Sequence, residues 1–374
     1  MTTELSRREF ISSVGTIAVG ALSVHSLAAQ VAPAVPSEGT PLRDRAASRG
    51  LLYGAATQRR ILKGDPSFAA AFAQQCGVLV PENELQWSVI RPTPDTFDFS
   101  RPDWLYNFTQ QHQMKFRGTS IAWNQALPAW FNSYVNSANA KQLLLTHIAT
   151  AVGHYSGKMH SWDVVNEVIQ PNDKRADGLC LKPWLELIGP DYIDMAFHAS
   201  AEADPHAILV WNENHLEFND AWSQAKRDFL VRLLKDKLQR GVPIHAVGLQ
   251  SHLSGTTTDF NGAAFTLFLR TIADLGVKIM VTEMDVTDVD LPADVTMRDQ
   301  AVAKVYYGYL STVLNEKAVV AVLTWGLSDH FTFISHYKPR KDGAPVRPLP
   351  LDYDMNPTPA WNAIARAFDE MPAR

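Results

Sequence analysis

Two glutamates in this chain directly follow apolar runs that are typical of buried β-strands. Glu167 ends the segment WDVVNE at residues 162–167, and Glu283 ends the segment VKIMVTE at residues 277–283. An unpaired carboxylate at such a position is costly, so its presence needs a chemical reason. Two carboxyl groups that face each other across a cleft can hydrolyse a glycosidic bond, because one protonates the leaving oxygen while the other attacks the anomeric carbon. Glu167 and Glu283 are therefore candidate catalytic residues, provided that the fold brings them together.

Strand-like and helical segments alternate regularly along the chain. Eight short runs rich in β-branched and apolar residues predict strands over residues 51–56, 77–80, 116–122, 160–165, 207–210, 244–249, 277–281 and 319–324. Apolar side chains at three- and four-residue spacing predict helices over residues 66–75, 141–154, 192–203, 221–240, 262–275 and 298–315. This alternation indicates an α/β protein with a (β/α)8 TIM barrel as its single catalytic domain, over residues 46–374.

Polar and aromatic side chains follow the predicted strands at their carboxyl ends. All strands of a parallel barrel open these ends on the same face, so the side chains are expected to converge on one mouth and to bring the two glutamates together. The residues concerned are Thr57, Glu82, Asn83, Trp123, Asn124, Asn166, Glu167, Asn212, Glu213, Gln250, His252, Glu283, Asp285, Trp325 and Asp329.

The first thirty residues have the layout of an export signal. Arg7 and Arg8 precede Phe10 and Ile11, and residues 11–27 contain no Asp, Glu, Lys or Arg. This pattern is typical of a twin-arginine signal peptide, and the run is too polar and too short for a transmembrane span. We expect a signal peptide over residues 1–30 and a Pro- and Ser-rich linker over residues 31–45. The protein would be exported by the twin-arginine translocon, without a stable membrane anchor, and would be periplasmic or secreted.

Composition narrows the classes of function. The 374 residues are 46% hydrophobic and 20% charged, which excludes a disordered chain. A net charge of -5 offers no basic surface for nucleic acid. Two cysteines, Cys76 and Cys180, are too few for a disulfide framework or a zinc site, and His147 and His154 have no third ligand nearby in the sequence. We expect neither a metal nor another cofactor, and the two-carboxylate reaction requires none.

Over nearly all of residues 48–370 the chain resembles glycoside hydrolase family 10, the family of retaining endo-β-1,4-xylanases. The resemblance implies cleavage of β-1,4-xylosidic bonds in xylan or xylo-oligosaccharides, with Glu167 as acid/base and Glu283 as nucleophile. It rests on the segments YGAAT (53–57), VPENELQW (80–87), RGTSIAWNQALPAW (117–130), WDVVNEVI (162–169), VGLQSHL (247–253), VTEMDV (281–286), LTWGLSD (323–329) and LPLDYDMNPTPAW (349–361).

The same resemblance implies roles around the cleaved bond. Asn166 would hydrogen-bond the 2-hydroxyl of the sugar at subsite -1, and Trp325 would stack on that sugar. Gln250 and His252 would hold the nucleophile and neighbouring hydroxyls. The sugar at subsite -2 would contact Glu82 and Asn83. The substrate-binding set is completed by Gln86, Trp123, Asn214 and Phe333.

The chain departs from the family pattern near these subsites. Gln86 replaces a usual Lys, Thr119 a usual His, Asn214 a usual Tyr and Phe333 a usual Trp, while Asn124, Gln125 and Ala126 replace His-Ser-Gln. Losing one charged hydrogen bond can cost on the order of 1.5–3 kcal/mol of binding. A different β-glycoside, such as a decorated oligosaccharide or a glycosylated small molecule, is therefore an alternative substrate. A glycan-binding barrel without turnover is a further alternative. In each case we expect a monomer whose partner is a β-linked oligo- or polysaccharide.

Overall fold

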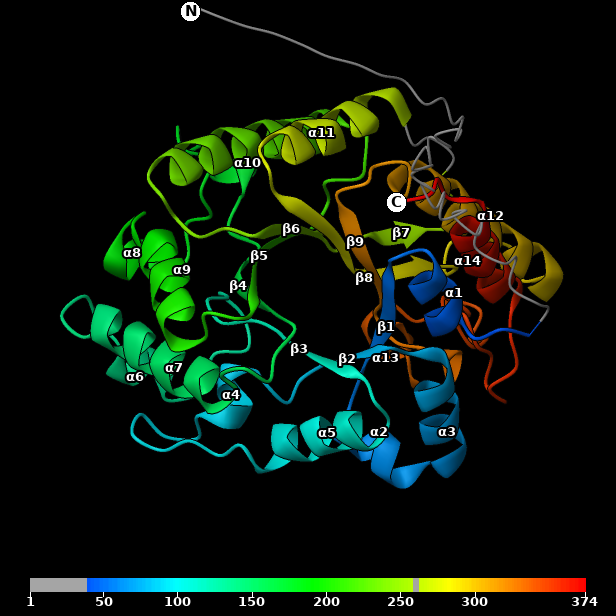
Figure 1. Ribbon diagram of the computed structural model, residues 1–374, viewed down its shortest axis with the longest axis horizontal. Coiled ribbons are helices and arrows are strands. Elements are labelled where there is room, and N and C mark those ends of the chain that lie inside the picture. Colours follow the sequence, from blue (N-terminus) through cyan, green and yellow to red (C-terminus); the bar gives the residue numbers. More distant parts are fainter. Residues whose placement is uncertain (1–38, 258–261) are drawn as a thin grey trace, which may run out of the picture. The chain divides into compact units, whose positions relative to one another are not determined.

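The computed structural model describes residues 39–257 and 262–374, and Figure 1 shows a ring of strands surrounded by helices. The predicted signal peptide and most of the predicted linker lie outside the described residues. Eight strands form a closed parallel ring in the order β1-β2-β3-β4-β5-β6-β8-β9, which confirms the predicted barrel. The strands of this described part are β1 (Leu52–Thr57), β2 (Val78–Pro81), β3 (Lys115–Gly118), β4 (Ser161–Asn166), β5 (Ile208–Glu213), β6 (Ala246–Leu249), β7 (His252–Ser254), β8 (Lys278–Thr287) and β9 (Val319–Thr324).

β9 has the predicted bounds, β1, β2 and β4 are shifted by one residue, β5 ends three residues late and β6 begins two residues late. The largest differences are in β3 and β8, and both affect the barrel mouth. β3 ends at Gly118 rather than Ala122, although Ala122 still donates its N–H to the Val164 carbonyl of β4 at 2.9 Å. β8 continues six residues beyond its expected end because its second half pairs with β7, a strand that the sequence did not predict. This pairing sets His252 opposite Asp285.

The helices lie outside the strand ring, and none of those described is long and apolar enough to cross a membrane. α3 and α9 have the predicted bounds, and α7, α10 and α11 differ by one residue. α12 begins three residues early because the Asp294 side chain caps its first turn at the Met297 N–H. The helices are α1 (Leu42–Ser48), α2 (Arg59–Gly64), α3 (Pro66–Gln75), α4 (Trp87–Ile90), α5 (Ser100–Gln111), α6 (Phe131–Tyr134), α7 (Ala140–His154), α8 (Pro183–Ile188), α9 (Tyr192–Ala203), α10 (Ala221–Gln239), α11 (Gly262–Asp274), α12 (Val295–Val313), α13 (Ile334–Tyr337) and α14 (Pro359–Glu370), with 3-10 turns η1 (Pro171–Asp173) and η2 (Asp329–Phe331).

The amino-terminal helix α1 begins inside the segment expected to be a linker. Leu42 and Ala46 are fully buried, and Arg45 forms an ion pair with Asp369 in α14. The apolar face of α1 therefore packs onto the barrel from Leu42 onward, four residues before the expected domain boundary.

Alternate residues along the strands supply two cores, as the two-residue period of a strand requires. Ala321 and Leu323 of β9 belong to a small cluster with side chains from β1, β2, β5, β6 and β8, whereas Val322 between them packs in the large cluster that includes the helices. The small cluster fills the barrel interior, so the barrel is a packed scaffold and chemistry is confined to its mouth.

Gly118 at the end of β3 makes room for Trp162 of β4, and we predict that a methyl group there destabilises the barrel. A Cβ at Gly118 would lie 2.1 Å from the Trp162 ring. Gly118→Ala should lower the free energy of unfolding by about 1–3 kcal/mol, because the buried indole must shift. Thermal and denaturant unfolding measure the effect. The matched control is Gly308→Ala within α12, where a Cβ meets nothing within 4 Å and helix propensity should raise stability by up to about 1 kcal/mol. Equal behaviour of the two variants would contradict the prediction.

Candidate functional site

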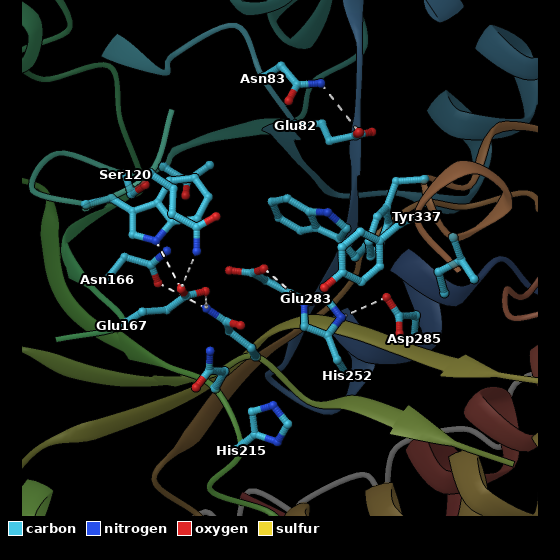
Figure 2. A pocket seen from close by; sticks show the side chains of 18 of the residues that line it. Glu82, Asn83, Ser120, Asn166, Glu167, His215, His252, Glu283, Asp285 and Tyr337 are labelled. Atoms are coloured by element: carbon cyan, nitrogen blue, oxygen red, sulfur yellow. Dashed lines mark hydrogen bonds and ion pairs between the residues drawn. The ribbon is translucent and has the colours of Figure 1, made fainter. Parts of the chain in front are cut away.

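A cavity of about 560 Å³ opens at the carboxyl ends of the barrel strands, and Figure 2 shows its side chains from close by. Both candidate carboxyl groups line it, contributed by β4 and β8 on different sides of the mouth. Every substrate-binding residue predicted from the sequence also lines it, namely Glu82, Asn83, Gln86, Trp123, Asn166, Asn214, Gln250, His252, Trp325 and Phe333.

Glu167 directly follows β4, where its backbone turns into the left-handed region with φ 54°. Its half-buried carboxyl group accepts three hydrogen bonds. Oε2 accepts from Trp123 Nε1 at 3.1 Å and from Gln125 Nε2 at 3.3 Å, and Oε1 accepts from Gln250 Nε2 at 3.0 Å. Three neutral donors thus orient Glu167 while leaving it open to the cavity.

The side chain of Gln250 was expected to hold Glu283, but it contacts Glu167 instead. Gln250 Nε2 also lies 3.1 Å from Asn166 Oδ1, so both of its side-chain contacts are with the end of β4. The reason is the position of Gln250 after β6. Its backbone carbonyl accepts the Glu283 N–H of β8 at 3.1 Å, whereas its side chain reaches past the neighbouring strand β5 to the end of β4.

Glu283 in β8 is held more rigidly, with only 7% of its surface exposed. Oε1 accepts from Asn212 Nδ2 at 2.7 Å, and Oε2 lies 3.3 Å from His252 Nε2. The Asn212 amide also lies 2.9 Å from Asn166 Oδ1, and Thr282 Oγ1 donates to Asn212 Oδ1 at 2.7 Å. Asn212 was expected at the mouth, but it lies fully buried beneath it and fixes one oxygen of Glu283.

His252 bridges Glu283 and Asp285. Its Nδ1 lies 2.8 Å from Asp285 Oδ2, a contact that the β7–β8 register creates. Burial opposes protonation of the ring, but the two carboxylates outweigh burial and raise the pKa of His252 well above its ordinary value. The imidazolium therefore donates to both carboxylates. Within residues 39–257 and 262–374, no group of three or more His, Cys, Asp or Glu side chains is arranged to hold a metal ion.

A polar cluster after β2 lines one side of the mouth. Glu82 Oε1 accepts from Gln58 Nε2 at 2.8 Å, and Gln86 Nε2 donates to Asn83 Oδ1 at 3.2 Å. Burial raises the pKa of the Glu82 carboxyl group. Figure 2 places Glu82 and Asn83 on one side of the two catalytic candidates and His215 on the other, so the cavity extends in both directions from Glu167 and Glu283.

Two aromatic side chains border the Glu283 side of the cavity. Phe333 packs edge-on against His252 with ring centroids 6.0 Å apart, and Tyr337 of α13 lies 5.9 Å from Phe333. Tyr337 is 82% exposed, which leaves its ring available at the rim. Phe333 and Tyr337 thus offer flat apolar surface on which a sugar or another ring can pack.

The strand-end rule placed some residues at the mouth that do not line it and missed others that do. Glu213 is fully buried and pairs with Lys226 at 2.8 Å; Thr57, Asn124, Asn212 and Asp329 also lie outside the cavity wall. These residues also lie at or after strand ends, but their side chains do not line the cavity. The wall also includes Ser120, His215, Thr287, Tyr337 and Lys338. His215 lies only two residues beyond the end of β5, so its position after a strand indicates it. Tyr337 lies in α13, ten or more residues beyond the end of β9, and no strand end indicates it.

We predict that Asp285→Asn lowers the pKa of His252, because it removes the carboxylate that contributes most to stabilising the imidazolium. NMR titration of the labelled imidazole measures the change. The wild-type ring should stay protonated well above the ordinary histidine pKa, and the variant ring should lose its proton at lower pH. The matched control is Asp290→Asn, since that exposed carboxylate pairs with Lys338 instead. A His252 pKa equal in wild type and Asp285→Asn would refute the interpretation.

Known proteins similar to this chain share both sequence and fold. The model of Glycosyl hydrolase family 10 matches residues 41–367. Endo-1,4-beta-xylanase 3 of Hypocrea jecorina is 31% identical over 317 residues, covering 84% of this chain and 81% of the relative. Beta-1,4-xylanase of Dictyoglomus thermophilum is 33% identical over 300 residues, covering 77% of this chain and 81% of the relative.

Solved structures give the same result. The xylanase 10B of Thermotoga petrophila RKU-1, solved in complex with xylobiose, superposes with a TM-score of 0.80 at 27% identity, covering 90% of this chain and 99% of that one. The native xylanase 10B of Thermotoga maritima has the same TM-score and identity, and covers 88% of this chain and 98% of that one. With its barrel, its paired carboxyl groups and a family match over residues 41–367, this chain belongs to glycosyl hydrolase family 10.

Proposed function

We propose that this protein is a retaining β-1,4-xylanase that hydrolyses xylan or xylo-oligosaccharides by double displacement. The observation that carries the proposal is the unequal environment of its two carboxyl groups in one cavity. Glu283 is 7% exposed and held from two sides, as suits a nucleophile. Glu167 is half-buried and open to the cavity, as suits a group that must exchange a proton with incoming water.

The reaction proceeds in two steps. Glu283 attacks the anomeric carbon while Glu167 donates its proton to the glycosidic oxygen, so the C–O bond breaks and the leaving sugar departs. A covalent glycosyl ester on Glu283 remains. Water then loses a proton to Glu167 and attacks the same carbon, which releases Glu283 and restores the starting protonation. Two inversions give net retention of the β-configuration.

Neighbouring side chains support each step. His252 and Asn212 donate to Glu283 and aim its oxygens, while Gln250 and Trp123 orient Glu167. Asn166 lines the cavity beside Glu167, where it can bond the 2-hydroxyl of the reacting sugar. We assign subsite -2 to the Glu82 side of the mouth and the leaving group to the opposite side.

Gln86 and Phe333, which differ from the residues usual in the family, favour a second candidate function with the same chemistry, a glycosidase for a different β-glycoside. The Gln86 amide donates to Asn83 and brings no charge to the cavity. Phe333 has a smaller aromatic face than Trp. Together the two changes leave open space beside an unsubstituted xylose and fewer hydrogen-bond donors to hold it. A binding protein without turnover is disfavoured, since both carboxyl groups and their supporting donors are present.

We also propose export through the twin-arginine translocon to the periplasm or exterior, as a monomer without a membrane anchor. The support is Arg7 and Arg8 with the uncharged run at residues 11–27. An enzyme that degrades a large extracellular polysaccharide must reach it outside the cytoplasm.

We predict that Glu283→Ala and Glu167→Ala fail in different ways. Glu283→Ala should abolish turnover of every substrate because no nucleophile remains. Glu167→Ala should still cleave aryl β-xylobiosides with good leaving groups, which need little protonation. Azide should accelerate the Glu167→Ala reaction by attacking the glycosyl-enzyme without a general base, and should yield a β-glycosyl azide. Steady-state kinetics with and without azide, and identification of that product, check the roles. Rescue of Glu283→Ala to a β-glycosyl azide would reverse the assignment.

We predict that Gln86, Thr119 and Phe333, in place of the Lys, His and Trp usual in the family, lower turnover of unsubstituted xylan. Gln86→Lys, Thr119→His and Phe333→Trp, singly and together, should raise kcat/KM on xylotriose relative to the best substrate in a panel of β-glycosides. A change of about tenfold corresponds to 1.4 kcal/mol, within reach of one recovered charged hydrogen bond. If the wild type already hydrolyses xylan efficiently and the ratio moves less than about threefold, the substitutions are neutral for specificity.

A further inference from the structure

Ser251 lies between two side chains that serve opposite halves of the site. Gln250 on one side contacts Glu167, and His252 on the other contacts Glu283. Ser251 itself has φ 63°, in the left-handed region that residues other than glycine rarely adopt. The backbone at this residue therefore sets the directions in which both neighbouring side chains leave the chain.

A buried carboxyl group holds this strained residue. Glu217, in the loop between β5 and α10, accepts two hydrogen bonds from Ser251 through the same oxygen: the backbone N–H at 2.9 Å and the hydroxyl at 3.1 Å. The Ser251 hydroxyl also lies 2.6 Å from the Tyr309 hydroxyl of α12. All three residues are fully buried.

The second oxygen of Glu217 argues against a role in stability alone. Oε2 is buried, and within the described part of the chain it has no hydrogen-bond partner. Burial raises the pKa of the Glu217 carboxyl group, and hydrogen bonds from its own backbone and from Ser251 oppose that rise. An incompletely satisfied buried carboxyl group lowers stability, and such costs and strained backbone tend to persist where function requires them.

We propose that Glu217 is a positioning residue for the reaction, which acts through Ser251 to present Gln250 to the acid/base and His252 to the nucleophile. Glu217 is absent from the cavity wall, so it can act on the reaction only through other residues. The inference rests on the proposed two-carboxylate hydrolysis. It does not depend on which sugar is bound, because its targets are Glu167 and Glu283.

The first test compares Glu217→Ala with Glu217→Gln on an aryl β-xylobioside and on xylotetraose. Glu217→Ala should lower kcat at least about tenfold with KM changed less than about twofold, since chemistry rather than binding is impaired. Glu217→Gln should recover most of the loss, because its amide oxygen can still accept from Ser251. If Glu217→Ala does not fold, Glu217→Asp serves instead, since it withdraws the acceptor by one methylene and should lower kcat in the same sense.

The second test is a double-mutant cycle with Ser251→Gly. Glycine adopts positive φ without support, so removal of the Glu217 carboxyl group should cost several-fold less kcat in the Ser251→Gly background. Fully additive losses would overturn the proposal, because they would mean that Glu217 does not act through the Ser251 backbone.

A spectroscopic measurement separates positioning from general destabilisation. In Glu217→Ala, the His252 ring should move from Glu283 and titrate at lower pH by NMR, whereas Glu217→Gln, which removes the Glu217 charge next to His252 but keeps the acceptor for Ser251, should titrate close to wild type. The control is Asp194→Asn, which breaks the buried pair with Lys237 at 2.6 Å in the outer helices. This variant should lower Tm without changing kcat or the His252 titration.

The outcomes distinguish this inference from the proposed function. Unchanged kcat and His252 titration in folded Glu217→Ala would refute the positioning role even if the wild type is an efficient xylanase. A wild type that cleaves no xyloside but another β-glycoside would refute the proposed substrate, and the same variants would then be measured on that glycoside.

Discussion

A carboxylate buried within β8 must be held by donors, and the rest of the site is arranged around this requirement. Glu283 forms no ion pair with any Lys or Arg of the described chain, and its ionic partner is the ring of His252. Burial alone would drive the proton from that ring, so Asp285 is needed on its far side. Asn212 supplies the second donor. The buried charge is therefore compensated by oriented groups that leave Glu283 free to react.

The barrel provides the space for this arrangement. A Cβ on Gly248 of β6 would lie 2.1 Å from Asn212 Oδ1, so glycine is required for Asn212 to reach Glu283. In β3 and β4, Arg117 and Asp163 form a fully buried ion pair with an N–O distance of 2.5 Å. Burial raises the pKa of Asp163, and Arg117 opposes that rise. Breaking such a pair is expensive, which helps to fix β3 against β4 near Glu167.

The chemistry and the recognition of substrate are supported by different parts of the fold. The donors that orient the two carboxyl groups come from residues at or just after strand ends and are largely buried. Gln86, Phe333 and Tyr337 instead belong to connections beyond the strands, where Tyr337 is 82% exposed. Loops at a barrel mouth can change without disturbing the scaffold. Substitutions in them can therefore change which sugar is bound while the two carboxyl groups and their donors stay in place.

Apolar periodicity and position after an apolar run are local properties, so the sequence predicts the barrel, five helices to within one residue, and Glu167 and Glu283 as a pair in one mouth. Three contacts could not be predicted in this way: the Gln250 side chain bonds Glu167 rather than Glu283, β7 pairs with β8, and Glu217 holds Ser251. Each of these contacts joins residues more than thirty positions apart. After a strand ends, the two-residue alternation no longer dictates where a side chain points, so its hydrogen-bond partner depends on which neighbouring strand or loop comes within about 3 Å of it.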